Sequence, residues 1–263
     1  MNMQQRSNQR ALALHQAIAN KLRQYPKLWT MNDYFKQLET NLEQLCRAQP
    51  SVLATWFNTD KEKIQSCFIL LILGSSLYGA SIGLWRAPLQ SFYVAIKFPL
   101  LIILTALGNA AINGMLAQLL GAKITFRQSF LAIIMSFTLV AIILGSFTPL
   151  SFFVLYNLPP MGTALAKNAH TIVLILHVIL IAFAGIVANI HLFKLLEYIC
   201  ANRFKAKQIV FTWLAVNMFL GCQLSWNLRP FFGTPKLEVS FLREDPFNGS
   251  FYEAIFRILK HYL

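Results

Sequence analysis

The stretch NAHTIVLILHVILIAFAGIVANIHLF, residues 168–193, decides the fold. It holds no Asp, Glu, Lys or Arg, and an α-helix of this length, rising about 1.5 Å per residue, crosses a hydrocarbon layer of about 30 Å. Four more stretches of this kind occupy residues 64–85, 98–119, 129–150 and 209–228, and none of them contains a charged residue. The sequence therefore predicts five transmembrane helices.

The composition of the whole chain favours the same fold. Hydrophobic residues make up 56% of the chain and charged residues 13%, whereas soluble domains carry about 25% charged residues. No Asp or Glu occurs between Glu62 and Glu197. A soluble core cannot hide so much apolar surface, but a bilayer solvates it. We therefore expect an all-α fold, an integral membrane helical bundle in contact with membrane lipids.

The bundle, residues 64–228, is flanked by two predicted regions: a cytoplasmic helical region over residues 1–63 and an interfacial tail over residues 229–263. In the first, Trp56 follows Val52 and Leu53 on one flank, which predicts a short interfacial helix with Trp56 at headgroup level.

The tail carries a helix-start signal of its own. Ser250 and Glu253 form a capping box, and the residues that follow predict an amphipathic helix for a membrane surface or a partner.

Two span boundaries are open in the sequence. The third stretch meets Pro149, but Phe152 and Phe153 allow it to continue. The segment from Arg86 to Lys97 is too short and too polar to span by itself, so we expect it to lie at the interface.

Lysines and arginines set the expected orientation. Five spans place fifteen of them on the N-terminal side and eight on the other. This bias predicts a cytoplasmic N-terminus in a cell membrane, such as a bacterial inner membrane. The net charge of +13 is explained by this flanking pattern and by anionic headgroups, so no nucleic-acid partner is expected.

Polar side chains inside the spans form a candidate seam, because such groups face the bundle interior rather than lipid. One interpretation is inter-helix hydrogen bonding, at about 1 kcal/mol per contact. The other is a path for a solute, a lipid headgroup or a proton. The candidate residues are Asn109, Asn113, His177, Asn217 and Ser225.

Arg229 is the charge singled out at the end of the fifth stretch. It is expected to anchor at the membrane surface, to bind a lipid phosphate or to tie the tail to the bundle.

No catalytic, cofactor or metal residues are predicted. His170, His177 and His191 fall on a seven-residue grid, and residues seven apart lie about 10 Å from each other along a helix, too far to share one ion. Residues 79–83, GASIG, match the letters of a GxSxG motif but lie inside an apolar span, and the spans contain no Asp or Glu. The chain contains no GxxxxGK[ST] motif. We therefore expect a protein that is not an enzyme.

Several stretches resemble a known family. QLSWNLRPFFGTP, residues 223–235, followed by GSFY, residues 249–252, resembles the QLSWxLRPFxGxP signature of a family of uncharacterised bacterial multi-pass membrane proteins. KFPLL, residues 97–101, and GAKITFRQ, residues 121–128, look like that family's other recurring stretches. The likeness covers about residues 65–255.

Residues 121–128 are also similar to a loop of the Yip membrane-protein family, whose members have five spans and an internal N-terminus. This resemblance implies a non-enzymatic scaffold or a trafficking-type adaptor. Neither family defines functional residues that transfer to this chain.

The function that we expect is therefore a non-enzymatic membrane scaffold, adaptor or assembly protein, which works through a protein partner or as a homo-oligomer. The alternative is a channel or facilitator for a small solute or lipid, which would use the polar seam.

Overall fold

The computed structural model describes residues 31–58, 61–159, 163, 165–233 and 238–262. Residues 1–30 of the predicted N-terminal helical region lie outside this part. The chain divides into two compact units, residues 1–40 and 41–263. All regular elements of the described part are helical. They are α2 (Met31–Arg47), α3 (Pro50–Thr55), the short 3-10 helix η1 (Trp56–Asn58), α4 (Lys61–Leu84), α5 (Pro88–Leu119), α6 (Phe126–Ser146), α7 (Thr148–Tyr156), α8 (Ala166–Cys200), α9 (Arg203–Asn227) and α10 (Phe251–Tyr262).

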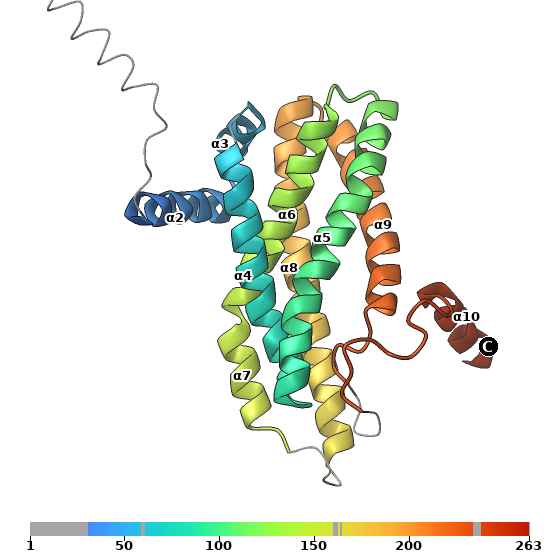
Figure 1. Cartoon of the computed structure of the whole chain (residues 1–263). Coiled ribbons are helices and arrows are strands. Elements are labelled where there is room, and N and C mark those ends of the chain that lie inside the picture. The colour runs from blue at the N-terminus through green and yellow to red at the C-terminus, as the bar shows by residue number, and fades with distance from the viewer. Residues whose placement is uncertain (1–30, 59–60, 160–162, 164, 234–237, 263) are drawn as a thin grey trace, which may run out of the picture. The chain divides into compact units, whose positions relative to one another are not determined.

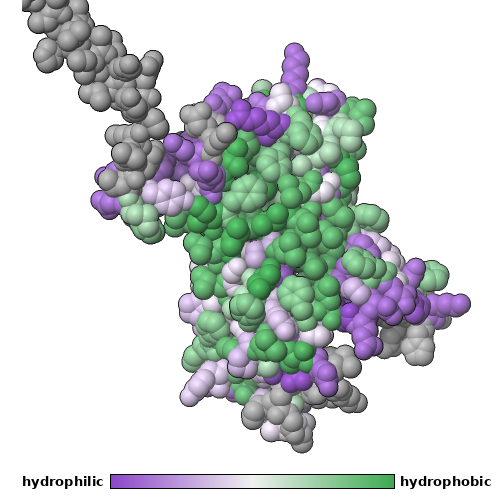
Figure 2. Space-filling view, in the orientation of Figure 1, coloured by the Kyte–Doolittle hydropathy of each residue, from purple (hydrophilic) through white to green (hydrophobic). Residues whose placement is uncertain are grey.

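The second unit is a helical bundle with the predicted number of spans. Five helical stretches of the described chain are long and apolar enough to cross a membrane, which confirms the all-α, multi-pass interpretation. In the bundle α4, α5 and α6 pack on one another, α8 packs on α6, and α9 packs on α5 and α8 (Figure 1). Apolar side chains cover the middle of the bundle in the view of Figure 2. The spans are Glu62–Leu84, Pro88–Leu119, Phe126–Tyr156, Asn168–Cys200 and Arg203–Asn227.

The third span does continue past the proline. Helix α6 ends at Ser146, Phe147 caps it in a right-handed conformation, and α7 starts at once with Pro149 in its first turn. A proline is tolerated there because the first backbone N–H groups of a helix have no intrahelical acceptor.

Residues 88–97 do not form a segment separate from the second span, and their position at the interface remains a prediction. Helix α5 begins at Pro88 and runs without interruption through Lys97 and Pro99 to Leu119. Lys97 is fully buried, which the sequence did not suggest because its hydrogen-bond acceptor, the carbonyl oxygen of Pro230, lies 133 residues away. A buried cation with such an acceptor does not end a span.

Glycines let α4 approach its two neighbours closely. A Cβ on Gly79 would lie 2.7 Å from the carbonyl oxygen of Val94 on α5, and one on Gly74 would collide with the carbonyl of Ala141 on α6. Small residues of this kind replace the hydrophobic driving force that helices lack in lipid. The core beside them includes Leu71, Tyr78, Ile82, Phe98, Ile102 and Leu144.

The segment from residue 41 to η1 packs on the bundle. Leu53, Trp56 and Phe57 are buried, and α3 contacts α8. The Nε1–H of Trp56 donates to Oε1 of Gln44 at 3.1 Å. The Trp56 ring is therefore enclosed by protein, because the short helix folds onto the side of α8. Its position at headgroup level remains a prediction.

Candidate functional site

Three asparagines of the predicted seam do come together. Nδ2 of Asn109 and Nδ2 of Asn113, both on α5, donate to Oδ1 of Asn217 on α9 at 2.7 and 3.2 Å. Nε1 of Trp213, one turn before Asn217, donates to the backbone oxygen of Asn113 at 2.8 Å. The four residues join α5 to α9.

The two members of this asparagine cluster on α5 are buried by the surrounding protein. Asn109 and Asn113 are fully buried, and their Oδ1 atoms have no hydrogen-bond partner among the described residues. The Asn217 side chain, in contrast, lines an internal cavity of about 340 Å³ between α5, α6, α8 and α9. The cluster therefore mainly bonds helices together, and only one of its members faces open space.

His177 lies in a different environment. Its Nδ1 is 2.7 Å from the hydroxyl of Tyr78 on α4, and its ring is 5.6 Å from that of Phe232 in the tail. No described residue partners its Nε2. The hydrogen bonds of His177 and of the asparagines thus join different pairs of elements, so the predicted seam consists of two separate polar contacts.

Ser225 belongs to neither contact. Its hydroxyl donates to the backbone oxygen of Cys222 on its own helix at 2.8 Å. Sequence periodicity placed Ser225 on the face of Asn217, but a serine in a helix readily satisfies itself within the preceding turn.

Arg229 packs on the last turn of α9. Its Nε donates to the backbone oxygen of Trp226 at 2.9 Å, and its guanidinium carbon is 3.0 Å from the indole centroid. Its own backbone oxygen accepts from the N–H of Arg243 at 3.2 Å. The side chain of Arg229 thus bonds to the end of its own helix, and its backbone oxygen bonds to the tail at Arg243. The roles expected for Arg229 remain predictions.

The sequence did not reveal a clamp on the turn after α9. Nε2 of Gln90 donates to the backbone oxygens of Pro230 and Phe231 at 2.9 and 3.0 Å, and Nζ of Lys97 donates to the Pro230 oxygen at 2.9 Å. Irregular backbone inside a membrane protein needs such donors. The only available signal was a lysine within an apolar run, which by default marks a functional or structural contact.

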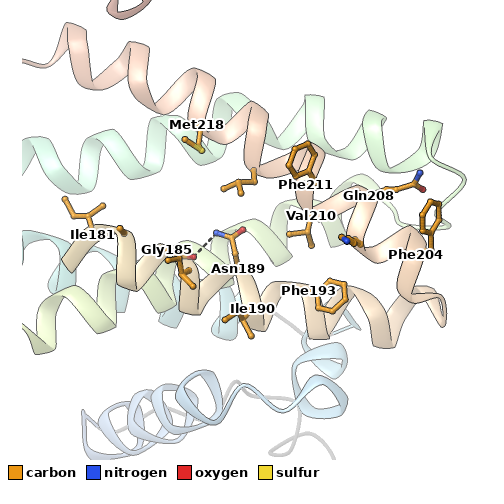
Figure 3. A pocket seen from close by; sticks show the side chains of 14 residues that line it. Ile181, Gly185, Asn189, Ile190, Phe193, Phe204, Gln208, Val210, Phe211 and Met218 are labelled. Carbon is orange, nitrogen blue, oxygen red and sulfur yellow. Dashed lines mark hydrogen bonds between the residues drawn. The ribbon is translucent and has the colours of Figure 1, made fainter. Parts of the chain in front are cut away.

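An open groove lies between α8 and α9. Its volume is about 950 Å³, and its walls are mainly apolar, with Asn189, Lys207 and Gln208 as the polar lining residues. Figure 3 shows side chains of both helices, including Ile190 and Phe211, around this space. Five residues, Ile181, Gly185, Asn189, Leu214 and Met218, line both the groove and the internal cavity. The groove therefore leads inward to Asn217.

Within the residues that the structure describes, no three His, Cys, Asp or Glu side chains come together as metal ligands would. Comparisons with protein-family models, curated proteins and solved structures found no match. The two family resemblances of the sequence remain predictions, and the functional argument depends on the geometry of the groove.

Proposed function

We propose that this multi-pass membrane protein is a non-enzymatic scaffold or assembly protein that binds a transmembrane helix of a protein partner in the groove between α8 and α9. The observation that supports this most directly is the contrast between two sides of α8. The chain covers one side itself with α3, whereas the side containing Gly185 borders the open groove.

The lining of the groove suits a helix. Ala182 and Gly185 are small residues one turn apart, and a Cβ on Gly185 would meet nothing within 4 Å. Small residues let two helix backbones approach closely in lipid. The groove residues of α8 extend from Ile181 to Phe193, about 18 Å of helix at 1.5 Å per residue, which is enough to seat several turns of a partner.

Asn189 offers such a partner a hydrogen bond. Its Nδ2 donates to the backbone oxygen of Gly185 at 2.8 Å, as Figure 3 shows. Its Oδ1 accepts no hydrogen bond from the described residues. Amide side chains hydrogen-bond across helix interfaces in membranes, at about 1 kcal/mol each.

The proposed location is a bacterial inner membrane with the N-terminal side in the cytoplasm. Basic residues support this orientation, because Lys123, Arg127, Lys194 and Arg203 lie near span ends on the N-terminal side. The connection between the first two spans, residues 85–87, contains one basic residue, Arg86. This distribution follows the positive-inside rule.

Site-specific photo-crosslinking in native membranes tests the proposal. A photoreactive side chain at Ile186 in the groove is expected to give one adduct of discrete protein mass. The same probe at Val178, which is 64% exposed on α8 and does not line the groove, is expected to give none.

Gly185→Phe is the variant expected to lose partner binding, and it is matched to a control variant on the same helix. Its Cβ has open space around it, and its ring adds bulk to the groove lining, so the adduct should fall at least about tenfold, equivalent to about 1.4 kcal/mol. Val178→Phe adds the same ring elsewhere on α8 and should leave the adduct unchanged. An adduct of twice the chain mass would identify the partner as a second copy. Lipid adducts alone, or an adduct insensitive to Gly185→Phe, would reject the scaffold proposal.

A facilitator for a lipid or a small solute is the second candidate, supported by the continuity of the groove with the cavity at Asn217. In this case Gly221→Leu, which adds bulk to the cavity lining, should slow solute or lipid movement in reconstituted vesicles. The asparagine cluster supports the scaffold instead, because its amides bond mainly to one another.

A further inference from the structure

The C-terminal end of α9 carries a second feature, independent of the groove. The guanidinium groups of Arg229 and Arg243 both lie near the indole ring of Trp226, at 3.0 and 5.1 Å from its centroid. A tryptophan ring attracts a cation. Two cations near one ring also repel each other, so the arrangement needs a further stabilising contact.

Backbone bonds hold the two arginines in place. Arg229 donates through Nε to the Trp226 oxygen at 2.9 Å, and Nη2 of Arg243 donates to the Asn248 oxygen at 2.7 Å. Neither arginine forms an ion pair with a carboxylate of the described residues. Glu253, the nearby acid on α10, pairs with Arg257 at 3.7 Å. The positive charge of the two arginines therefore remains uncompensated by an acidic side chain.

The buried atoms of Trp226, Arg229 and Arg243 that lack a hydrogen-bond partner are all donors. Nε1 of Trp226, Nη2 of Arg229 and Nε of Arg243 are buried, and none has an acceptor within the described chain. Buried polar groups without partners are rare in native proteins, and indole and guanidinium nitrogens can only donate. Burial lowers the pKa of Arg229, and the neighbouring Arg243 lowers it further. An acceptor-rich anion beside the ring would offset the repulsion between the two arginines.

There is room for such an anion. An open cavity of about 470 Å³ lies beside the ring, lined by Trp226, Arg243, Asn248, Gly249, Ala254 and Arg257. Arg257 is exposed, with most of its side chain accessible, so it adds a third guanidinium that can reach a ligand. Its partner Glu253 is equally exposed, and an exposed pair of this kind holds the arginine weakly.

We propose that Trp226, Arg243 and Arg257, which line this cavity beside Arg229, form a binding site for a phosphate group. Guanidinium groups bind phosphate oxygens in pairs through parallel N–H bonds, and Arg243 and Arg257 supply two guanidinium groups to the cavity. The phosphate belongs either to the headgroup of an anionic lipid or to a free phosphate compound, since both present the same oxygens to the site.

Full-length chain in lipid nanodiscs tests the site in two arms. In the first arm, phosphatidylglycerol is titrated into phosphatidylcholine discs, and retained lipid is counted by native mass spectrometry. In the second, inorganic phosphate is titrated in phosphatidylcholine discs, and thermal stabilisation is measured. A lipid ligand gives saturable retention in the first arm only, whereas a free phosphate compound gives stabilisation in the second.

Arg243→Gln is expected to weaken ligand binding about tenfold in the arm that responds. Lys260→Gln removes the same charge from α10 and does not line the cavity, so it should change neither arm. Equal effects of the two variants would overturn the proposal.

If Arg243→Gln disturbs the fold of the tail, Arg257→Gln serves as a second test of the site. Arg257 is exposed, and its side chain pairs only with Glu253 in the described chain, so the tail should stay folded. Backbone amide exchange of residues 251–256 checks this directly. Binding is expected to weaken several-fold relative to Lys260→Gln. Unchanged binding in both arms, with the tail intact, would overturn the site.

Discussion

Gly74 and Gly185 are both glycines in apolar transmembrane helices, yet their surroundings are opposite. A Cβ on Gly74 of α4 would collide with the backbone of α6, while a Cβ on Gly185 of α8 would meet nothing within 4 Å. Half of the most apolar stretch of the α6–α7 span is buried, 50%, against 11% of that of α9. Apolar helices thus form a closed interface in one region and an open one in the other.

This difference separates two uses of small residues. At α4 the glycines let the helices of the same chain meet backbone to backbone. At α8 a glycine leaves a hollow that nothing in the described chain fills. The first arrangement stabilises the fold, and the second leaves a surface for another molecule.

The largest expected effect comes from substituting a glycine at the closed interface between α4 and α6. Gly74→Leu forces α4 away from Ala141 and should lower the free energy of unfolding by about 3 kcal/mol or more, because overpacked cores strain the backbone. Thermal unfolding in detergent measures it. Gly185→Leu, the matched control, should change stability by less than about 0.5 kcal/mol. Similar losses for both would contradict the contrast between the regions.

The clamp on the turn after α9 gives the next effect. Gln90→Leu combined with Lys97→Met leaves the Pro230 and Phe231 carbonyls without their donors, which should cost about 2 kcal/mol. Lys97→Met alone should cost less, because Gln90 still donates to Pro230. Amide exchange of residues 229–233 and unfolding in detergent measure both. A double variant as stable as wild type would show that the clamp is dispensable.

The asparagine cluster sharpens the comparison between closed and open contacts. Asn217→Leu removes the acceptor of two buried amides and should cost about 1.5 kcal/mol. Asn189→Leu changes the same residue type in the open groove, where its amide bonds only to its own helix, and should be close to neutral. The same unfolding assay compares them, and the reverse order would disprove the assignment of closed and open regions.

The smallest effect concerns the contact between α4 and α8. Tyr78→Phe removes the hydrogen bond to His177 while keeping the ring, at an expected cost of about 1 kcal/mol. Tyr156→Phe changes a side chain that is 92% exposed and serves as the control. No difference between the two variants would mean that the Tyr78–His177 bond contributes nothing measurable.

The spans were predictable because the absence of charge over a helical length has one physical solution, burial in lipid. The spacing of Asn109 and Asn113 also placed both on one face of a helix, but it could not name their partner, since that depends on which helices meet. Lys97 was interpreted as a boundary because its acceptor is remote in the sequence. The groove could not be predicted either, because it depends on how far α8 and α9 separate, which the residues of the two helices do not specify by themselves.

The contacts of Gln90 and Lys97 with Pro230 have a consequence for the order of assembly. The acceptor of Lys97 is synthesised 133 residues later, a delay of about 10 s at a translation rate of about 5–20 residues per second. During that interval the second span is already made, with an ammonium group that has no carbonyl to bind. We expect the nascent helix to keep this group near water or the insertion machinery until the ribosome has finished the fifth span.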